Sequence, residues 1–435
     1  MRFFTSFAPP VCCMSRSQLY SSRYGHNQYT PTGGCMHMAS DTEEWRNSTI
    51  VAQMKRQGLP HKTAAIGKYL NTHEFFCGAN SKLYEGWDRF YTMCTDSNFF
   101  DQTFNIDGEE QVIKGYTTSV IGNETVRWIR ETVEAGDPFL AWVTPHAPHI
   151  ADGVYPYVTQ AAPWYDGVNE FRGQPLPQQA PRVPNYNFHA ADHHWLWSQQ
   201  PPMTQFSQNW TDFLFRQRFR SMWSVDDLLS ASLDLLEELG VANNTYIILS
   251  SDHGYSLGNL RQPSCKLQMY TWNTQVPLVF AGPGLKKNYT ISDQIVSNVD
   301  IGATILDLLG GDVSSTNFDG KSAKPILMES EDTPSFRDRF LVEYWSLGTV
   351  WRGAPWNQSC NPNEATTKPG CPQETHLVDV NNNTYLALRV VNDTANYNYA
   401  EFWESNIQPD FPVEDVYFRE LYDINTDPWQ QKNLA

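Results

Sequence analysis

The stretch YIILSSDHG at residues 246–254 decides the fold class of this chain. Four apolar residues bounded by polar ones are typical of a short buried strand. An apolar pattern with the 3.6-residue period of a helix precedes it at residues 224–239, with Ser224 as the expected cap and Gly240 as the stop. In α/β sheets, ligands bind just beyond the carboxyl ends of strands. We therefore expect Asp252 and His253 to belong to a functional site.

The same alternation of elements recurs along the chain. Apolar runs predict strands at residues 62–66, 138–143 and 276–281, and periodic patterns predict helices at 123–134 and 300–309. Polar side chains follow two of these strands: Lys68 follows the first, and His146 and His149 follow the second. We expect these groups to meet Asp252 at one edge of a central mixed sheet flanked by helices, which is an α/β architecture.

Composition divides the chain into two expected domains. Residues 1–335 form the larger one, and residues 150–215, rich in Pro, Gln, Trp and Tyr, read as an insertion that partly lines the substrate pocket. Residues 336–435 are predicted to form a smaller α+β domain. The run Asp192-His193-His194 is not expected to bind zinc, because no Cys or further His stands nearby at zinc-ligand spacing.

The overall charge excludes some classes of partner. The 435 residues carry a net charge of −17, with 40% hydrophobic and 14% aromatic residues, as in a globular protein. A chain this acidic is not expected to bind nucleic acid, and it favours small esters over large polyanions. No apolar run approaches the roughly 18 residues of a membrane span.

Sequons and cysteines point to the secretory pathway, with an extracellular, lysosomal or vacuolar destination. Asn-x-Ser/Thr occurs at eight positions: Asn47, Asn123, Asn209, Asn243, Asn288, Asn357, Asn382 and Asn392. Of the eight cysteines, Cys360 and Cys371 flank a polar loop and are predicted to form a disulfide. The first eleven residues lack the apolar region of a signal peptide, which predicts an incomplete N-terminus.

The stretch CCMSR at residues 12–16, followed by QLYSSRYGHN at 18–27, resembles the type I sulfatase signature. Other segments match that family in order: TAAIGKYLN at 63–71, PHAP at 145–148, SDHGY at 251–255, SNVD at 297–300 and LYD at 421–423. The segment from Arg216 to Val225 and the loop at 251–255 are most similar to the arylsulfatase and N-acetylglucosamine-6-sulfatase branch of the family. The resemblance implies an alkaline-phosphatase-like sandwich with a small C-terminal domain and hydrolysis of sulfate esters.

The resemblance also implies roles for individual residues. A formylglycine-generating enzyme would oxidise Cys12 to formylglycine, whose hydrate attacks sulfur, and Arg16 would hold that hydrate. Lys68 and Lys266 would bind sulfate oxygens, while His146 would contact the sulfate or leaving oxygen as general acid, with His149 as its neighbour. Asp252, His253 and the modified Cys12 would ligate Ca²⁺ or Mg²⁺. The substrate would be a small sulfate ester, and the oligomeric state is left open.

Two departures from the family leave alternatives open. Met14 stands where the family has Pro, and it could block oxidation of Cys12. The family's other two metal ligands are Asp residues on a strand upstream of the signature, and we expect that strand to be missing here. The alternatives are therefore a catalytically inactive sulfatase-like glycoprotein, or a related phosphate or phosphonate ester hydrolase. A Cys-His protease lacks a suitable context around Cys12.

Overall fold

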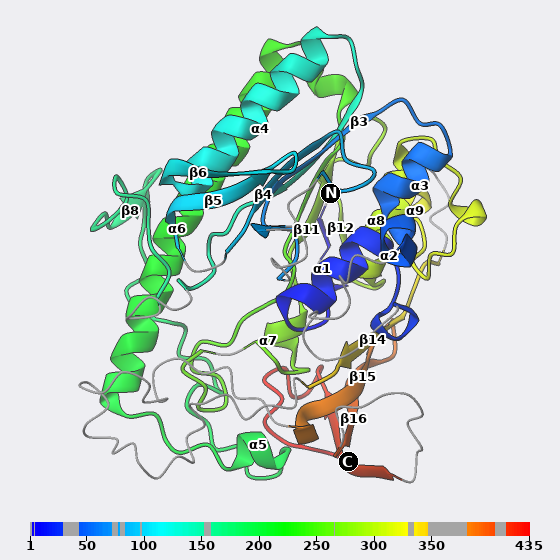
Figure 1. Cartoon of the computed structure of the whole chain (residues 1–435). Coiled ribbons are helices and arrows are strands. Elements are labelled where there is room, and N and C mark those ends of the chain that lie inside the picture. The colour runs from blue at the N-terminus through cyan, green and yellow to red at the C-terminus, as the bar shows by residue number, and fades with distance from the viewer. Residues whose placement is uncertain are drawn as a thin grey trace.

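The structure is a computed structural model of the chain (Figure 1). It describes residues 2–3, 5–28, 43–71, 77–78, 83–95, 98–151, 158–264, 266–328, 335–346, 381–404 and 415–435. The predicted disulfide between Cys360 and Cys371 lies outside these residues. Within them, Cys77 and Cys94 form a disulfide.

The central layer consists of two separate sheets. The first has the strand order β6-β5-β4-β3-β7, from Glu109–Tyr116, Phe100–Ile106, Arg89–Met93, Lys62–Gly67 and Phe139–Thr144. The second has the order β10-β11-β1-β12, from Ile247–Ser250, Leu278–Ala281, Arg2–Phe3 and Thr290–Ile291. Strands β4, β3 and β7 run parallel, whereas β10 and β11 are antiparallel, so the layer is mixed as expected.

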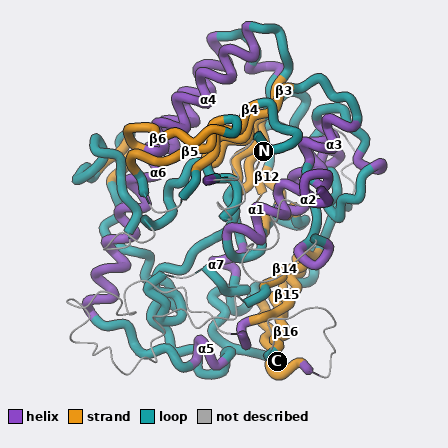
Figure 2. The backbone as a smooth tube through the Cα atoms, in the orientation of Figure 1, coloured by secondary structure: helices purple, strands orange, loops and turns teal. Residues whose placement is uncertain are grey.

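Helices cover both faces of this layer. Helices α4 (Thr117–Glu134) and α6 (Gln205–Glu238) pack against each other along one face, as Figure 1 shows. Helices α1 (Cys12–Ser21), α3 (Ile50–Arg56) and α8 (Asn298–Leu308) pack together on the other face. Figure 2 shows the same arrangement by type of secondary structure.

The remaining short elements complete the larger domain. These elements are η1 Gly25–Asn27, α2 Glu43–Ser48, β8 Glu170–Phe171, β9 Gln174–Pro175, α5 Trp195–Ser198, η4 Ala242–Asn244, α7 Thr271–Thr274, η5 Val313–Ser315 and α9 Lys324–Leu327. Strands β2 (Ser6–Phe7) and β13 (Val296–Ser297) form a further parallel pair.

Two predicted helix starts are wrong. Helix α4 starts at Thr117 rather than at residue 123. Helix α6 starts at Gln205, capped by Thr204, whose hydroxyl accepts from the Ser207 amide, so Ser224 is not a cap. Ser224 lies mid-helix and donates to the Ser221 carbonyl. The helix therefore begins inside the segment expected to be an insertion over residues 150–215. Asp227 also lies mid-helix and accepts a hydrogen bond from the Tyr165 hydroxyl.

The C-terminal part of the chain forms a four-stranded antiparallel sheet. Its strands are β14 (Arg339–Tyr344), β15 (Thr384–Val391), β16 (Asn396–Trp403) and β17 (Val416–Asp423), in sequence order, with η7 (Asn381–Asn383) before β15. Their buried side chains share a hydrophobic core with residues of the larger domain, including Phe7 and Tyr270.

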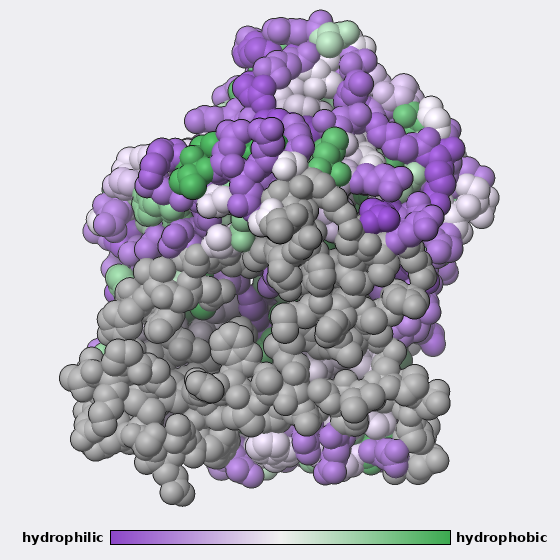
Figure 3. Space-filling model, in the orientation of Figure 1, coloured by the Kyte–Doolittle hydropathy of each residue, from purple (hydrophilic) through white to green (hydrophobic). Residues whose placement is uncertain are grey.

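Two surface properties bear on the class of protein. Across the described residues, no helix has both the length and the apolar run that a membrane crossing requires. On the face shown in Figure 3, the described residues are mostly hydrophilic, and hydrophobic side chains occur in small, separate groups.

Candidate functional site

The site is built around the first residue of helix α1. Cys12 is buried, is the first residue of that helix, and is a free thiol, whereas its neighbour Cys13 is disulfide-bonded. The Cys12 sulfur lies 3.1 Å from the Lys266 ammonium and 3.3 Å from Nε2 of His253.

The surroundings of Cys12 favour a negative charge. Burial raises the pKa of its thiol, but Lys266, Lys68 and His253 outweigh burial and hold that pKa well below its ordinary value. The N-terminal end of a helix favours the same sign of charge. The pocket is therefore suited to an anionic group at this position.

Arg16 joins two strand ends that are distant in sequence. Its Nε donates to Oδ2 of Asp252 at 2.9 Å, and its Nη1 donates to the Lys68 carbonyl at 2.8 Å. Burial lowers the pKa of Arg16, but Asp252 more than offsets this effect and the net shift is upward. The fork of the guanidinium thus fixes the loop after β10 relative to the end of β3.

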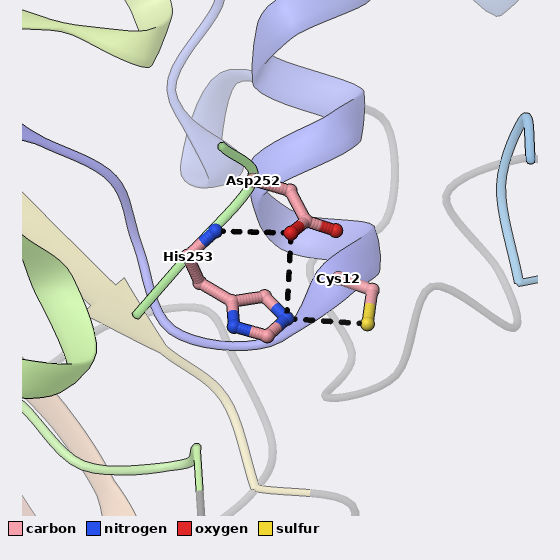
Figure 4. A group of neighbouring side chains, drawn as sticks. All are labelled: Cys12, Asp252 and His253. Carbon is pink, nitrogen blue, oxygen red and sulfur yellow. Dashed lines mark hydrogen bonds and ion pairs between the residues drawn. The ribbon is translucent and has the colours of Figure 1, made fainter. Parts of the chain in front are cut away.

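Asp252 and His253 follow β10, as the sequence predicts, and Figure 4 shows their side chains beside Cys12. Oδ1 of Asp252 accepts from the His253 amide at 3.1 Å and lies 3.7 Å from Nε2 of His253. Nδ1 of His253 lies 2.7 Å from the Gly254 carbonyl, and this contact orients the ring so that Nε2 faces Cys12. Burial raises the pKa of Asp252, but His253 and Arg16 outweigh it and lower the pKa.

These three residues form a candidate cation-binding group. One ligand atom each from Cys12, Asp252 and His253 lies within 4.8 Å of the others. Among the described residues, the other such group is Cys77, Cys94 and Glu110, but its two cysteines form a disulfide.

Lys68 follows β3 at the position where the strand must turn. Gly67 adopts a φ of 111°, and a Cβ there would lie 2.1 Å from the Thr144 carbonyl oxygen, so a side chain is sterically excluded. This close approach lets the chain bend after β3 and places the buried Lys68 in the wall of the same cavity as Asp252.

The two histidines after β7 also reach the site. His149 Nε2 lies 2.9 Å from the Lys266 ammonium, and its Nδ1 lies 2.8 Å from the Ile150 carbonyl. His146 is buried and stacks on Phe99 with ring centroids 4.5 Å apart, and its ring lies 5.2 Å from that of His149. All six predicted catalytic residues and both additional metal ligands therefore converge on one region.

Sequence reasoning missed two residues at this site. Nδ2 of Asn298, on α8, donates to Ser15 Oγ at 2.6 Å and to the Asp252 carbonyl at 3.3 Å, so it ties the signature helix to the metal loop. Arg218, on α6, lies over the Tyr255 ring at 4.2 Å and donates to the Pro148 carbonyl at 2.7 Å. The SNVD match at 297–300 pointed to Asn298, but it gave no role.

The run Asp192-His193-His194 has structural partners. Nδ1 of His193 lies 2.9 Å from Asp192, and its Nε2 lies 2.8 Å from the Gln430 carbonyl. His194 contacts the Tyr417 hydroxyl, and burial lowers its pKa to about 3. These contacts attach the segment to the C-terminal sheet.

Comparison with known proteins identifies the family. The sulfatase family model matches residues 2–311 of this chain. The chain belongs to the sulfatase family. Human N-acetylglucosamine-6-sulfatase is 32% identical over 449 residues, a match that covers 100% of this chain and 75% of that protein. An arylsulfatase of Volvox carteri is 26% identical, and the match covers 98% of this chain and 64% of that protein.

Two further matches agree with this family assignment. An extracellular sulfatase homolog of Drosophila melanogaster is 26% identical over 77% of this chain and 29% of its own length. A solved structure described as a complex with D-glucosamine-2-N,6-O-disulfate superimposes with a TM-score of 0.66 at 19% identity, covering all of this chain and 85% of that one. The fold is thus the alkaline-phosphatase-like fold of sulfatases, and the chain is a sulfuric ester hydrolase.

Proposed function

We propose that this sulfatase works through a formylglycine made from Cys12, with a divalent cation bound beside it. The observation that carries the proposal is the position of Cys12, which starts α1 within 3.3 Å of both Lys266 and His253. A formylglycine hydrate supplies a hydroxyl that attacks sulfur and a second hydroxyl through which sulfate is later released. The remaining groups position and neutralise the anionic ester.

The surrounding residues divide these tasks. Lys68 and Lys266 bind sulfate oxygens and stabilise the charge that develops in the transition state. His149 lies 2.9 Å from Lys266 and helps to orient that ammonium. His146, buried against Phe99, donates the proton that the leaving alcohol requires. Arg16 fixes the backbone on both sides of the site.

The donor set fits a cation only in part. Asp252 supplies a hard carboxylate oxygen, and His253 presents Nε2 toward Cys12. Calcium takes six to eight oxygen ligands, so these side chains make up a minority of its usual shell. When bound, Ca²⁺ or Mg²⁺ would polarise the ester and neutralise its charge.

We further propose that the substrate is a 6-sulfated N-acetylglucosamine. Support comes from the N-acetylglucosamine-6-sulfatase relative, which matches this chain along its whole length. Hydrolysis of methylumbelliferyl N-acetylglucosamine 6-sulfate should exceed hydrolysis of 4-nitrocatechol sulfate in kcat/KM. The reverse order would favour an arylsulfatase, and a preference for nitrophenyl phosphate would favour a phosphoester hydrolase.

The proposed location is the secretory pathway or the extracellular space. The Drosophila relative is named an extracellular sulfatase, and four sequons within the described part of the chain are exposed, at Asn123, Asn209, Asn243 and Asn288. Glycans at these positions would meet no steric barrier from the fold. If treatment with a glycosidase lowers the apparent mass of the protein secreted by its native host, this location is supported. A secreted protein without glycans would contradict it.

Mass spectrometry of the Cys12 peptide tests the central chemistry. The aldehyde mass is expected in protein purified from the native host, and the Cys12→Ala variant should be inactive. An unmodified thiol would instead support the inactive sulfatase-like glycoprotein. One observation bears on that second candidate, which rests on Met14 in place of the signature Pro. The Met14 side chain is fully buried and packs against Trp345, so this substitution is part of the hydrophobic core.

A further inference from the structure

We infer that Asn185 is a positioning residue for Lys266. Asn185 belongs to the segment expected to be an insertion over residues 150–215, and it acts on the loop of residues 256–264 and 266–268, called the Lys266 loop below. Through this loop it keeps the Lys266 ammonium 3.1 Å from the Cys12 sulfur. The effect on catalysis rests on the proposed function, whereas the position of Lys266 can be measured without it.

The Lys266 loop is closed at its base. Oγ of Ser256 lies 3.1 Å from Oε1 of Gln268, and Nε1 of Trp272 donates to the same hydroxyl at 2.9 Å. Ser256 and Gln268 are both buried. These contacts fix the two ends of the loop, but the path of the chain between them depends on the turn at residues 258–262.

That turn has an unfavourable backbone conformation. Leu260 and Arg261 adopt φ angles of 48° and 63°, so two successive residues with a Cβ lie in the left-handed region. Inside the turn, the Gly258 amide donates to the Gln262 carbonyl at 2.7 Å, and the Gln262 amide donates to the Asn259 carbonyl at 2.9 Å. Such a conformation persists only where the surrounding structure holds it.

Asn185 holds the turn from outside the loop. Its main-chain carbonyl accepts from the Leu260 amide at 2.9 Å, and its Oδ1 accepts from Nδ2 of Asn259 at 2.9 Å. Its own Nδ2 donates to the Trp429 carbonyl at 3.0 Å, which anchors it to the C-terminal tail. Because Asn185 is fully buried, removal of its side chain would leave buried polar groups unpaired.

The partners fix the orientation of both amides. The Trp429 carbonyl can only accept a hydrogen bond, so Nδ2 of Asn185 faces it and Oδ1 faces Asn259. The Leu257 amide can only donate, so Oδ1 of Asn259 accepts from it at 3.0 Å and Nδ2 of Asn259 faces Asn185. A substitution at either asparagine therefore breaks this chain of hydrogen bonds at a defined place.

Other contacts of the turn come from the same segment as Asn185. The Asn187 amide donates to the Gly258 carbonyl at 2.7 Å, and Nη1 of Arg261 donates to the Gln200 carbonyl at 2.8 Å. The segment thus supports the Lys266 loop, and the Asn185 side chain joins that support to the C-terminal tail.

Lys266 lies beyond the turn and reaches the site. Its side chain is buried, with Nζ 3.1 Å from the Cys12 sulfur and 2.9 Å from Nε2 of His149. Cys12 and His149 belong to other parts of the fold, so a shift of the loop would move the ammonium away from both. A displacement of about 1 Å at a catalytic group can lower the rate by roughly 10²-fold.

Labelling of lysines tests the position of Lys266 directly. Reductive methylation with formaldehyde and a borane, followed by mass spectrometry, compares Lys266 with Lys68, which is also buried but follows β3. Asn185→Ala removes two hydrogen bonds, each of which contributes roughly twofold to tenfold, so the ratio of Lys266 to Lys68 labelling should rise by roughly tenfold. An unchanged ratio, or an equal rise at both lysines, would overturn the inference.

Two further variants keep the test decisive. Asn259→Ala removes the partner of Asn185 and should raise the same ratio, even if the N185A protein does not fold. Asn433→Ala is the matched control, because Asn433 attaches the same C-terminal tail through the Asp192 carbonyl at 3.1 Å and the Leu421 amide at 3.0 Å. The ratio should stay unchanged in N433A, and a rise equal to that in N185A would show that the tail, rather than Asn185, holds the loop.

Activity separates positioning from stability. N185A should lower kcat by roughly tenfold in the parent protein but by less than about twofold in a K266A background, where the loop has no ammonium to place. Equal losses in both backgrounds would refute a positioning role. A K266A variant with the parental kcat would instead refute the role proposed for Lys266 in catalysis, and the labelling ratio would still decide whether Asn185 positions that lysine.

Discussion

Replacing Arg16 with Lys tests whether the fork of the guanidinium holds the site together. Arg16 uses two different nitrogens, Nε for Asp252 at 2.9 Å and Nη1 for the Lys68 carbonyl at 2.8 Å. A lysine keeps the charge, but its single ammonium cannot occupy both positions. One charge-assisted hydrogen bond is lost, which costs about 1.5–3 kcal/mol.

The side chains of Arg16 and Asp252 are only 11% and 19% exposed, so solvent screening removes little of the stabilisation from their hydrogen bond. We expect R16K to lower the free energy of unfolding by about 2 kcal/mol, which is a large fraction of the stability of a typical domain. Urea denaturation measures the change through the midpoint at constant m-value. The ratio kcat/KM should fall as well, because Lys68 and Asp252 lose their common support.

Arg130→Lys provides the matched control. Arg130 donates two bonds of 2.8 and 2.9 Å to Glu238, but these side chains are 37% and 60% exposed. An exposed pair contributes little, so R130K should unfold like the parent protein. Equal effects of the two substitutions, or no effect of R16K, would refute the reasoning.

Three further predictions concern the site and its supports. Lys266→Ala should lower kcat by roughly 10²–10³-fold because it removes a hydrogen-bond donor beside Cys12. The control is Lys114→Ala, which removes an exposed lysine. Equal kcat values for the two variants would contradict the role assigned to Lys266. EDTA should lower activity reversibly, with Ca²⁺ or Mg²⁺ restoring it; full activity after exhaustive chelation would exclude a cation. The hydrogen bond to Glu343 raises the pKa of His26, so this stabilisation is present below the ordinary histidine pKa and disappears as the pH rises through the raised value. The difference in Tm between the parent and H26Q should accordingly shrink from about pH 5 to 8, and a pH-independent difference would argue against the ion pair.

Local patterns were sufficient to predict the strands that carry the site. The apolar runs before Lys68, His146 and Asp252 match β3, β7 and β10 within one or two residues. Because these strands end at the same edge of the layer, their following residues were expected to meet. The family resemblance supplied Cys12, Arg16 and Lys266, which no periodicity identifies.

Long-range pairing was not predictable from sequence. Asn298 meets Ser15 across 283 residues, and nothing local to either residue signals that contact. The start of α6 was missed although a signal existed, since Thr204 is a suitable cap and Trp210 and Leu214 are buried at helical spacing.

The contacts of the signature with the C-terminal sheet have a consequence for timing. Gly25 donates to Glu343, a partner 318 residues further along the chain, and Met14 packs on Trp345. A ribosome that adds roughly 5–20 residues per second needs about 16–64 s to cover that distance. During this interval, the N-terminal segment lacks the residues that bury it. The segment that contains Cys12 therefore lacks part of its packing until the C-terminal sheet has been made, and slower translation of the last third of the message would lengthen that period.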